Sequence, residues 1–185
     1  MAIFIVIWSL WFLSELVLRI FLKSGESDKK NQDKGTLRII WISVGIGNTL
    51  GILCNMIIYI PISTSLIIPY IGLSLIVFGM IFRFFAIWTL GQLFTVEVTI
   101  REKHQVKRDG LYKYIRHPSY TGMIISFIGF GLSLNNWLSL AIIVIPVISS
   151  VLYRIKIEEK SLIEHFGQEY IAYTKGTKRL IPWIF

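Results

Sequence analysis

Cysteine and histidine are scarce in this sequence of 185 residues. It contains one cysteine, Cys54, inside an apolar run, and three histidines. A single cysteine cannot form an intramolecular disulfide, and so few potential ligands predict no metal site. Charged residues are also few, at 16% of the chain. The composition therefore argues against a soluble domain stabilised by disulfides or by zinc.

Several well-known catalytic motifs are absent as well. The sequence has no Walker loop, no G-x-S-x-G nucleophile elbow, no H-E-x-x-H and no dinucleotide-binding glycine fingerprint. Gly129-Phe130-Gly131 is a lone GxG inside an apolar run, and close helix packing explains it better than phosphate binding. Serine hydrolase, kinase and metalloprotease functions thus lose their main support.

Apolar residues dominate what is present. They make up 54% of the chain, and the mean hydropathy is +0.65. Several runs approach or exceed the roughly 20 apolar residues that span a bilayer. These runs cover residues 1–22, 37–60, 66–88, 118–134 and 137–153. We expect an all-α integral membrane protein with about five transmembrane helices, three in an N-terminal part (1–88) and two in a C-terminal core (89–185).

The formal net charge of +8 is concentrated between the apolar runs. Residues 23–38, 89–116 and 154–185 hold five, six and six Lys and Arg, whereas the turns at 61–65 and 135–136 hold none. A nucleic-acid-binding domain would carry such charge on a solvated face, so we expect no nucleic-acid partner. The positive-inside rule predicts a multi-pass cell-membrane protein with its N-terminus outside and its C-terminus in the cytoplasm.

Charged residues lie well inside two of the apolar runs of the N-terminal part. Glu15 and Arg19 are four residues apart, which predicts an ion pair within one helix. Arg83 lies about two turns before the end of its run, so we expect its guanidinium to reach the membrane interface rather than a polar cavity.

A polar, basic segment separates the third and fourth apolar runs. Charge and glycine predict irregular or partly extended structure over 89–117, including TVEVTI at 95–100, and a short helix at 111–115. The RHPSY segment at 116–120 then places a cation, an imidazole, a helix-starting proline and a phenol within five residues. Polar groups at membrane depth face a cavity, a partner or a ligand, so this segment is a candidate functional site.

A second polar cluster follows the last apolar run, with Arg154, Glu158, Glu159 and His165. Arg154 and Glu158 share one helix face because they are four residues apart. Both clusters fall on the same predicted side of the membrane. They indicate either a cytoplasmic-side pocket or interfacial ion pairs whose arginines bind lipid headgroups.

Together these segments resemble a known family. The pattern V-x-x-x-G-x-Y-x-x-x-R-H-P-S-Y-x-G at 106–122 is followed by E-E-x-x-L-x-x-x-F-G-x-x-Y-x-x-Y at 158–173. This combination is similar to the isoprenylcysteine carboxyl methyltransferase family, which is related to phospholipid methyltransferases. The resemblance covers residues 90–185.

The resemblance implies a membrane methyltransferase that uses S-adenosyl-L-methionine without a dinucleotide-binding fold. It implies a cofactor pocket on the cytoplasmic side, formed by the C-terminal half, with the apolar tail at 182–185 acting as a lid. The residues carried over as catalytic are Arg116 and Arg154. Those carried over as cofactor-binding are His117, Tyr120 and Glu158, followed by Glu159, Tyr112, Val106 and Leu111.

The implied chemistry leaves the acceptor open. An ionised carboxylate needs no general base, and Arg116 or Arg154 could hold it by a bidentate contact. An amine or thiol acceptor would need a base, for which His117 is the nearest candidate. We expect a lipophilic small molecule or lipid that reaches the pocket from the bilayer. The alternatives are an NADPH-dependent membrane reductase of the sterol-reductase type and a non-catalytic lipid-binding scaffold.

Overall fold

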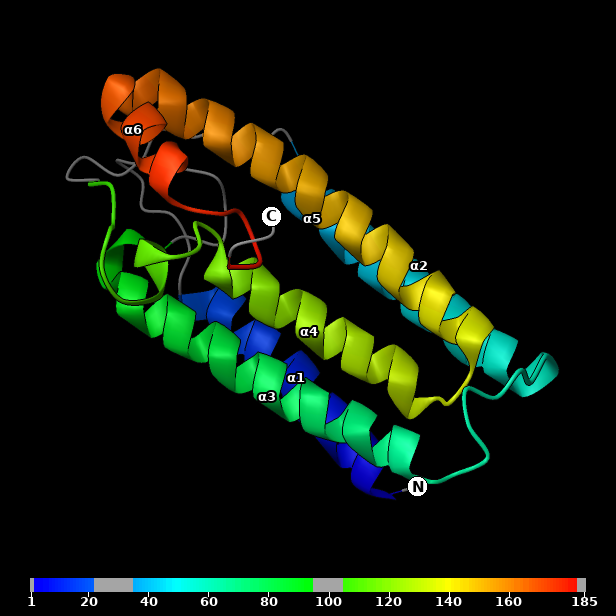
Figure 1. The fold of residues 1–185 in the computed structure, drawn as a ribbon. Coiled ribbons are helices and arrows are strands. Elements are labelled where there is room, and N and C mark those ends of the chain that lie inside the picture. Colours follow the sequence, from blue (N-terminus) through cyan, green and yellow to red (C-terminus); the bar gives the residue numbers. More distant parts are fainter. Residues whose placement is uncertain (1, 22–34, 95–104, 183–185) are drawn as a thin grey trace.

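The computed structural model describes residues 2–21, 35–94 and 105–182, whose regular structure is helical (Figure 1). This confirms the all-α prediction. The long helices are α1 (Ala2–Phe21), α2 (Thr36–Ile57), α3 (Ile67–Leu90), α4 (Pro118–Ser133) and α5 (Trp137–Phe166). The short elements are η1 (Gly91–Leu93), η2 (Gly110–Lys113) and α6 (Gln168–Gly176).

Three helices of the described residues, α2, α3 and α5, are long and apolar enough to cross a membrane. The described apolar stretch of α1, Ile3–Leu18, is shorter, and α4 has 16 residues. The predicted count of five spans therefore stays a prediction. Helix α5 has 30 residues, about 45 Å at 1.5 Å per residue, which exceeds the roughly 30 Å of a hydrocarbon core.

Helices α3 and α4 lie against each other with their backbones in close contact (Figure 1). A Cβ atom added to Gly79 would lie 2.5 Å from the carbonyl oxygen of Gly122. One added to Gly129 would lie 2.5 Å from the carbonyl oxygen of Gly72. Only glycine allows this approach, so these residues fix where along α3 the α4 helix sits.

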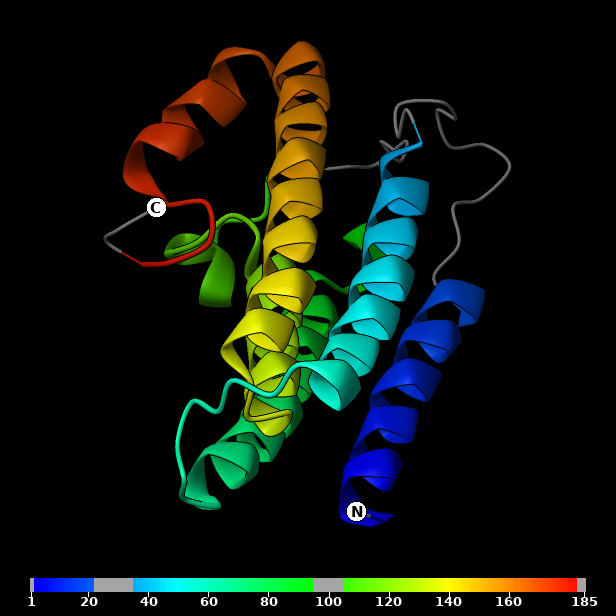
Figure 2. The ribbon, with the colours of Figure 1, turned by 90° about the vertical axis from the view of Figure 1, so that its right-hand side faces the viewer.

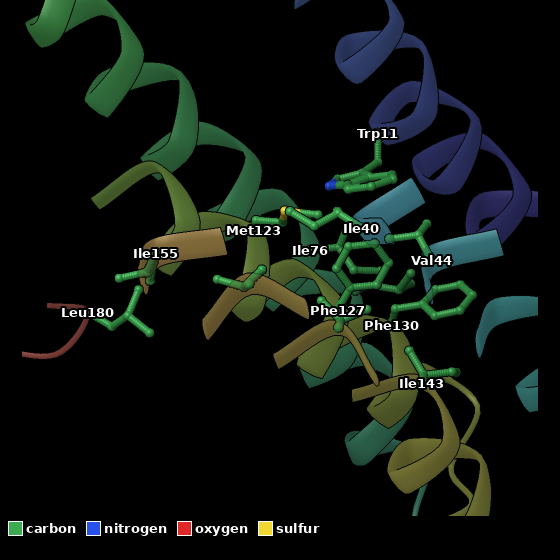
Figure 3. Packing of buried hydrophobic residues seen from close by; sticks show 13 residues of the cluster. Trp11, Ile40, Val44, Ile76, Met123, Phe127, Phe130, Ile143, Ile155 and Leu180 are labelled. Atoms are coloured by element: carbon green, nitrogen blue, oxygen red, sulfur yellow. The ribbon is translucent and has the colours of Figure 1, made fainter. Parts of the chain in front are cut away.

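Helix α2 packs along α5, and α1 lies at the edge of the bundle (Figure 2). A Cβ on Gly51 would lie 2.6 Å from Cγ1 of Ile143. At this position the missing side chain of glycine makes room for the side chain of Ile143, not for the backbone of another helix. The apolar core between the helices includes Val44, Ile76, Phe127 and Ile143 (Figure 3).

The predicted turn at Asn135-Asn136 is confirmed. Asn135 adopts a left-handed conformation, with φ of 50°, which asparagine tolerates better than most residues. The side chain of Asn136 caps α5 by accepting hydrogen bonds from the backbone N–H groups of Leu138 and Ser139. This turn brings α5 back along α4.

The RHPSY segment leads into α4, with Pro118 at the first helical position as predicted. Just before the helix, the segment pairs with the chain that follows α6. The N–H of Arg116 donates to the carbonyl of Lys178 at 2.7 Å, and that of His117 to the carbonyl of Arg179 at 3.0 Å. Of the other predictions for this half, the TVEVTI stretch at 95–100 and all but Pro182 of the tail at 182–185 lie outside the described residues.

Candidate active site

Helix α4 begins and α5 passes into α6 at the same end of the bundle (Figure 1). A cavity opens there. The space between its walls is about 1310 Å³ when the open solvent at its mouth is included. The apolar part of its lining consists of Leu18, Leu37, Ile40, Trp41, Leu90, Leu93, Phe94, Val106, Met123, Leu162 and Phe166. The polar part includes Tyr112, Arg116, His117, Tyr120, Arg154, Glu158, Tyr170 and Tyr173.

The lining draws on both halves of the chain, whereas the expected cofactor pocket was formed by the C-terminal half. Helices α1, α2 and α3 contribute much of the apolar wall, because the bundle folds its N-terminal helices around the RHPSY segment. Sequence reasoning missed this contribution, since the apolar residues concerned look the same as any lipid-facing residue.

A chain of hydrogen bonds links Arg154, Tyr120 and Glu158 across the cavity wall. The Nε of Arg154 donates to the Tyr120 hydroxyl at 2.7 Å, and that hydroxyl donates to Oε2 of Glu158 at 2.8 Å. Arg154 also donates through Nη1 to Oγ1 of Thr36 at 2.8 Å. Arg154 is 2% exposed, whereas the side chain of Glu158 is 29% exposed. These hydrogen bonds thus hold the partly accessible carboxylate of Glu158 at the cavity.

The neighbouring Glu159 has a different environment. Its Oε1 accepts from Nε of Arg116 at 2.8 Å, and its Oε2 accepts from Nε of Arg179 at 2.9 Å. Arg116 further donates through Nη1 to the backbone carbonyls of Thr174, at 3.2 Å, and Thr177. We call this group of residues the C-terminal clamp, because it fastens the chain after α6 to α5 and to the RHPSY segment.

His117 lies between the two glutamates. Its ring stacks on that of Tyr120 with centroids 5.7 Å apart. Its Nδ1 is 3.9 Å from Oε1 of Glu158, and its Nε2 is 3.5 Å from Oε1 of Glu159. Within the described residues the buried Nε2 makes no hydrogen bond of normal geometry. The ring is therefore placed by packing and remains capable of a further polar contact.

Three buried tyrosines, Tyr112, Tyr170 and Tyr173, complete the polar side of the cavity. The Tyr173 hydroxyl donates to the carbonyl of Tyr112 at 2.6 Å, and that of Tyr112 donates to the carbonyl of Ala86 at 3.3 Å. Burial, with the Glu158 charge adding to it, raises the pKa of Tyr112 far above its ordinary value. Burial also raises the pKa of Tyr173 to about 12, against the lowering effect of Arg116 and Arg108. These phenols are neutral hydrogen-bond donors at physiological pH.

The structure brings most of the predicted site residues together. Seven of the nine line the cavity: Val106, Tyr112, Arg116, His117, Tyr120, Arg154 and Glu158. Leu111 and Glu159 do not belong to that lining within the described part of the chain. Among the described residues, no group of three or more His, Cys, Asp or Glu could hold a metal ion.

An ion pair between Arg83 and Glu15 was not predicted. The expectation that Arg83 reaches the membrane interface is wrong, because Arg83 is 9% exposed and Glu15 is 6% exposed. Arg83 engages both Glu15 oxygens, at 2.6 and 2.9 Å. Helical spacing suggested Arg19 as the partner of Glu15, but the side chain of Arg19 lies outside the described residues. A partner 68 residues away depends on how α1 docks on α3, which spacing along one helix does not reveal.

The region that carries the RHPSY segment and both glutamates matches a known protein family. The model of the isoprenylcysteine carboxyl methyltransferase (ICMT) family matches residues 71–164, just over half of the chain. The chain belongs to this family. The ICMT match spans α4, the RHPSY segment and most of α5, so it includes both glutamates and both candidate arginines.

Similar relatives carry related names. Protein-S-isoprenylcysteine O-methyltransferase B of Arabidopsis thaliana is 35% identical over 115 residues, which are 61% of this chain and 58% of the relative. Protein-S-isoprenylcysteine O-methyltransferase of Saccharomyces cerevisiae is 37% identical over 116 residues, 62% of this chain and 48% of the relative. The chain thus spans less than two thirds of the length of these ICMT relatives.

A solved structure of the eukaryotic intramembrane Ras methyltransferase ICMT is also similar. It superposes with a TM-score of 0.56 at 27% sequence identity, covering 84% of this chain and 54% of that one. The helical arrangement is therefore similar to that of the solved ICMT, and three of the described helices are long and apolar enough to cross a membrane.

Proposed function

We propose that this chain is an S-adenosyl-L-methionine-dependent membrane methyltransferase that esterifies the carboxylate of a lipophilic, prenylcysteine-like acceptor. One observation carries the proposal: the motif residues His117, Tyr120 and Glu158 line the same cavity as an apolar wall from α1 and α2. A site for a polar cofactor and a site for a lipophilic acceptor would then be continuous.

The residues present fit the proposed cofactor. Glu158 supplies a partly accessible carboxylate for a cationic group, and His117 lines the same cavity beside it. Buried aromatic rings of Tyr112 and Tyr170 offer surfaces for an adenine ring. When bound, S-adenosyl-L-methionine supplies a methyl group activated by an adjacent sulfonium charge.

The residues of the protein would then position the methyl donor and the acceptor carboxylate and exclude water from them. An ionised carboxylate is already nucleophilic, so no residue needs to remove a proton. Arg154, buried beside the cavity, supplies a fixed positive charge for that carboxylate. Arg116 instead donates its hydrogen bonds to Glu159 and to the carbonyls of Thr174 and Thr177. These contacts suit a role in positioning the chain around the site. A thiol or amine acceptor would require His117 as a base.

The test is titration of the detergent-purified protein with S-adenosyl-L-methionine and, separately, with NADPH. Transfer of a labelled methyl group to N-acetyl-S-farnesylcysteine is then measured. We expect binding of the methyl donor and ester formation, and loss of both in Glu158→Ala. Binding of NADPH alone would favour a reductase, and binding of neither would favour a lipid-binding scaffold.

We also infer that the cavity faces the cytoplasm, with the N-terminus outside. The positive charge at 23–38, 89–116 and 154–185 supports this orientation. Accessibility of a single cysteine introduced at Lys160, in a background where Cys54 is replaced by Ser, tests it in intact cells. Labelling by an impermeant reagent without permeabilisation would overturn the orientation.

A further inference from the structure

The buried Glu15–Arg83 pair lies where α1, α3 and α4 meet, at the wall of the cavity. The two side chains are 7% and 11% exposed. Ionised groups are costly at this depth, and an ion pair of this kind contributes little net stability compared with apolar residues of similar size. Its placement therefore indicates a role beyond holding helices together.

Arg83 uses its remaining donors on the RHPSY segment. Its Nη1 lies 2.8 Å from Oγ of Ser119 and 3.1 Å from the backbone carbonyl of Ser119. Ser119 stands between His117 and Tyr120, in the first turn of α4. Among the described residues, that helix has no side-chain cap at its N-terminus. Arg83 therefore tethers the first turn of α4 by donating to Ser119, which is a different contact from an N-cap, whose side chain accepts from the free N–H groups.

The position of Arg83 follows from glycine packing. A Cβ atom on Gly122 would lie 2.8 Å from the backbone nitrogen of Arg83 and 2.9 Å from its Cβ. The backbone of α4 therefore touches α3 at Arg83 itself. This contact sets the guanidinium beside the first turn of α4, while Glu15 holds its other edge by two hydrogen bonds.

We propose that Arg83 is a positioning residue for the methyltransferase site: oriented by Glu15, it fixes Ser119 and so aligns His117 and Tyr120 at the cavity. This inference rests on the proposed function. Glu15 has two tasks, since it orients the planar guanidinium and neutralises a charge that would otherwise face the cavity. Helix α1, from outside the family-matched region, is thereby linked to the motif.

Exchanging the charges of Glu15 and Arg83 distinguishes a role in positioning Ser119 from a role in holding α1 against α3. The double variant Glu15→Arg/Arg83→Glu can restore an ion pair between α1 and α3. However, a glutamate at position 83 cannot donate to the Ser119 carbonyl. We expect the swap to keep most of the thermal stability and to lower kcat by roughly 10- to 100-fold. The matched control is Lys160→Glu/Glu164→Lys, which swaps an exposed pair on α5 whose atoms are 3.8 Å apart.

Two milder variants serve in case the swap does not fold. Arg83→Lys keeps the charge but loses the planar fork, and Ser119→Ala removes only the hydroxyl contact. We expect both to lower kcat while KM for the methyl donor stays close to that of the wild type, with Arg83→Lys the more severe.

Hydrogen exchange of the protein without substrates gives a second readout. The amides of Tyr120 and Thr121 donate to the His117 carbonyl at 3.1 and 3.2 Å, so they report on the first turn of α4. We expect faster exchange there in Arg83→Lys and in the swap, but not in the control. Wild-type kcat and wild-type exchange in Arg83→Lys or in the folded swap would overturn the inference. A wild-type protein with no methyl transfer would instead refute the proposed function, whatever the exchange shows.

Discussion

The two sides of the candidate site are built from adjacent residues of α5 but are held in different ways. On the cavity side, Glu158 is 29% exposed in its side chain and bonds to the Tyr120 hydroxyl. On the clamp side, Glu159 is 8% exposed and pairs with Arg116 and Arg179. An α-helix turns by about 100° per residue, so neighbours can serve a ligand and the fold separately. The difference teaches that paired glutamates need not share one role.

The largest effect should come from breaking the clamp side. Glu159→Gln removes the anion that two arginines share, and Arg116 is left buried without its charged partner. Losing one member of a buried pair costs about 3 kcal/mol or more. We expect a clear drop in the thermal unfolding temperature in detergent, together with loss of activity. Glu164→Gln, on the exposed face of the same helix, is the control and should unfold like the wild type.

The matching change on the cavity side should leave the fold intact. In Glu158→Gln we expect an unchanged unfolding temperature but roughly 100-fold weaker binding of S-adenosyl-L-methionine, about 2.7 kcal/mol. Calorimetric titration measures the binding. Equal loss of stability in Glu158→Gln and Glu159→Gln would show that the division between the two sides is wrong.

Removing one hydroxyl sharpens the comparison. Tyr120→Phe keeps the ring that stacks on His117 but cuts the link between Arg154 and Glu158. We expect about a tenfold loss in kcat/KM, or about 1.4 kcal/mol, with little change in stability. Steady-state kinetics with labelled methyl donor measure it. If Tyr120→Phe were as fast as the wild type, the hydrogen bonds of the Tyr120 hydroxyl to Arg154 and Glu158 would have no role in catalysis.

The smallest effect concerns Tyr173, which supports the clamp side. Tyr173→Phe loses one hydrogen bond, to the Tyr112 carbonyl, which costs about 1 kcal/mol. Its pKa is raised from 10.0 to about 12, so the neutral phenol stabilises the fold fully below about pH 10. That contribution is lost as pH rises toward 12. Unfolding midpoints of the two proteins should therefore converge over this range, and a constant difference would contradict the assignment.

Local signals in the sequence predicted several elements well. Pro118 at the start of α4 and the Asn135-Asn136 turn each depend on the backbone preferences of one or two residues. The motif residues His117, Tyr120 and Glu158 do line one cavity, and their role in binding a cofactor stays a prediction. Such features need no knowledge of distant contacts.

Features that depend on tertiary packing could not be predicted in the same way. Which of Glu158 and Glu159 faces the cavity is decided by how α5 is rotated against α4. The burial of Arg83 is decided by the docking of α1 and by the close approach at Gly122. Likewise, Leu37 and Trp41 lie on the cavity wall, and no local signal in the sequence distinguishes them from lipid-facing residues.

The length of α5 has a consequence for how rates should be measured. The helix is about 45 Å long, and the cavity is lined by residues of its C-terminal half, from Arg154 to Phe166. Under the proposed function, an acceptor with a long apolar tail would meet this site while still dissolved in lipid. The quantity that governs turnover would then be the mole fraction of acceptor within the bilayer or micelle. Adding inert detergent at a fixed bulk concentration of acceptor should therefore slow the reaction by surface dilution.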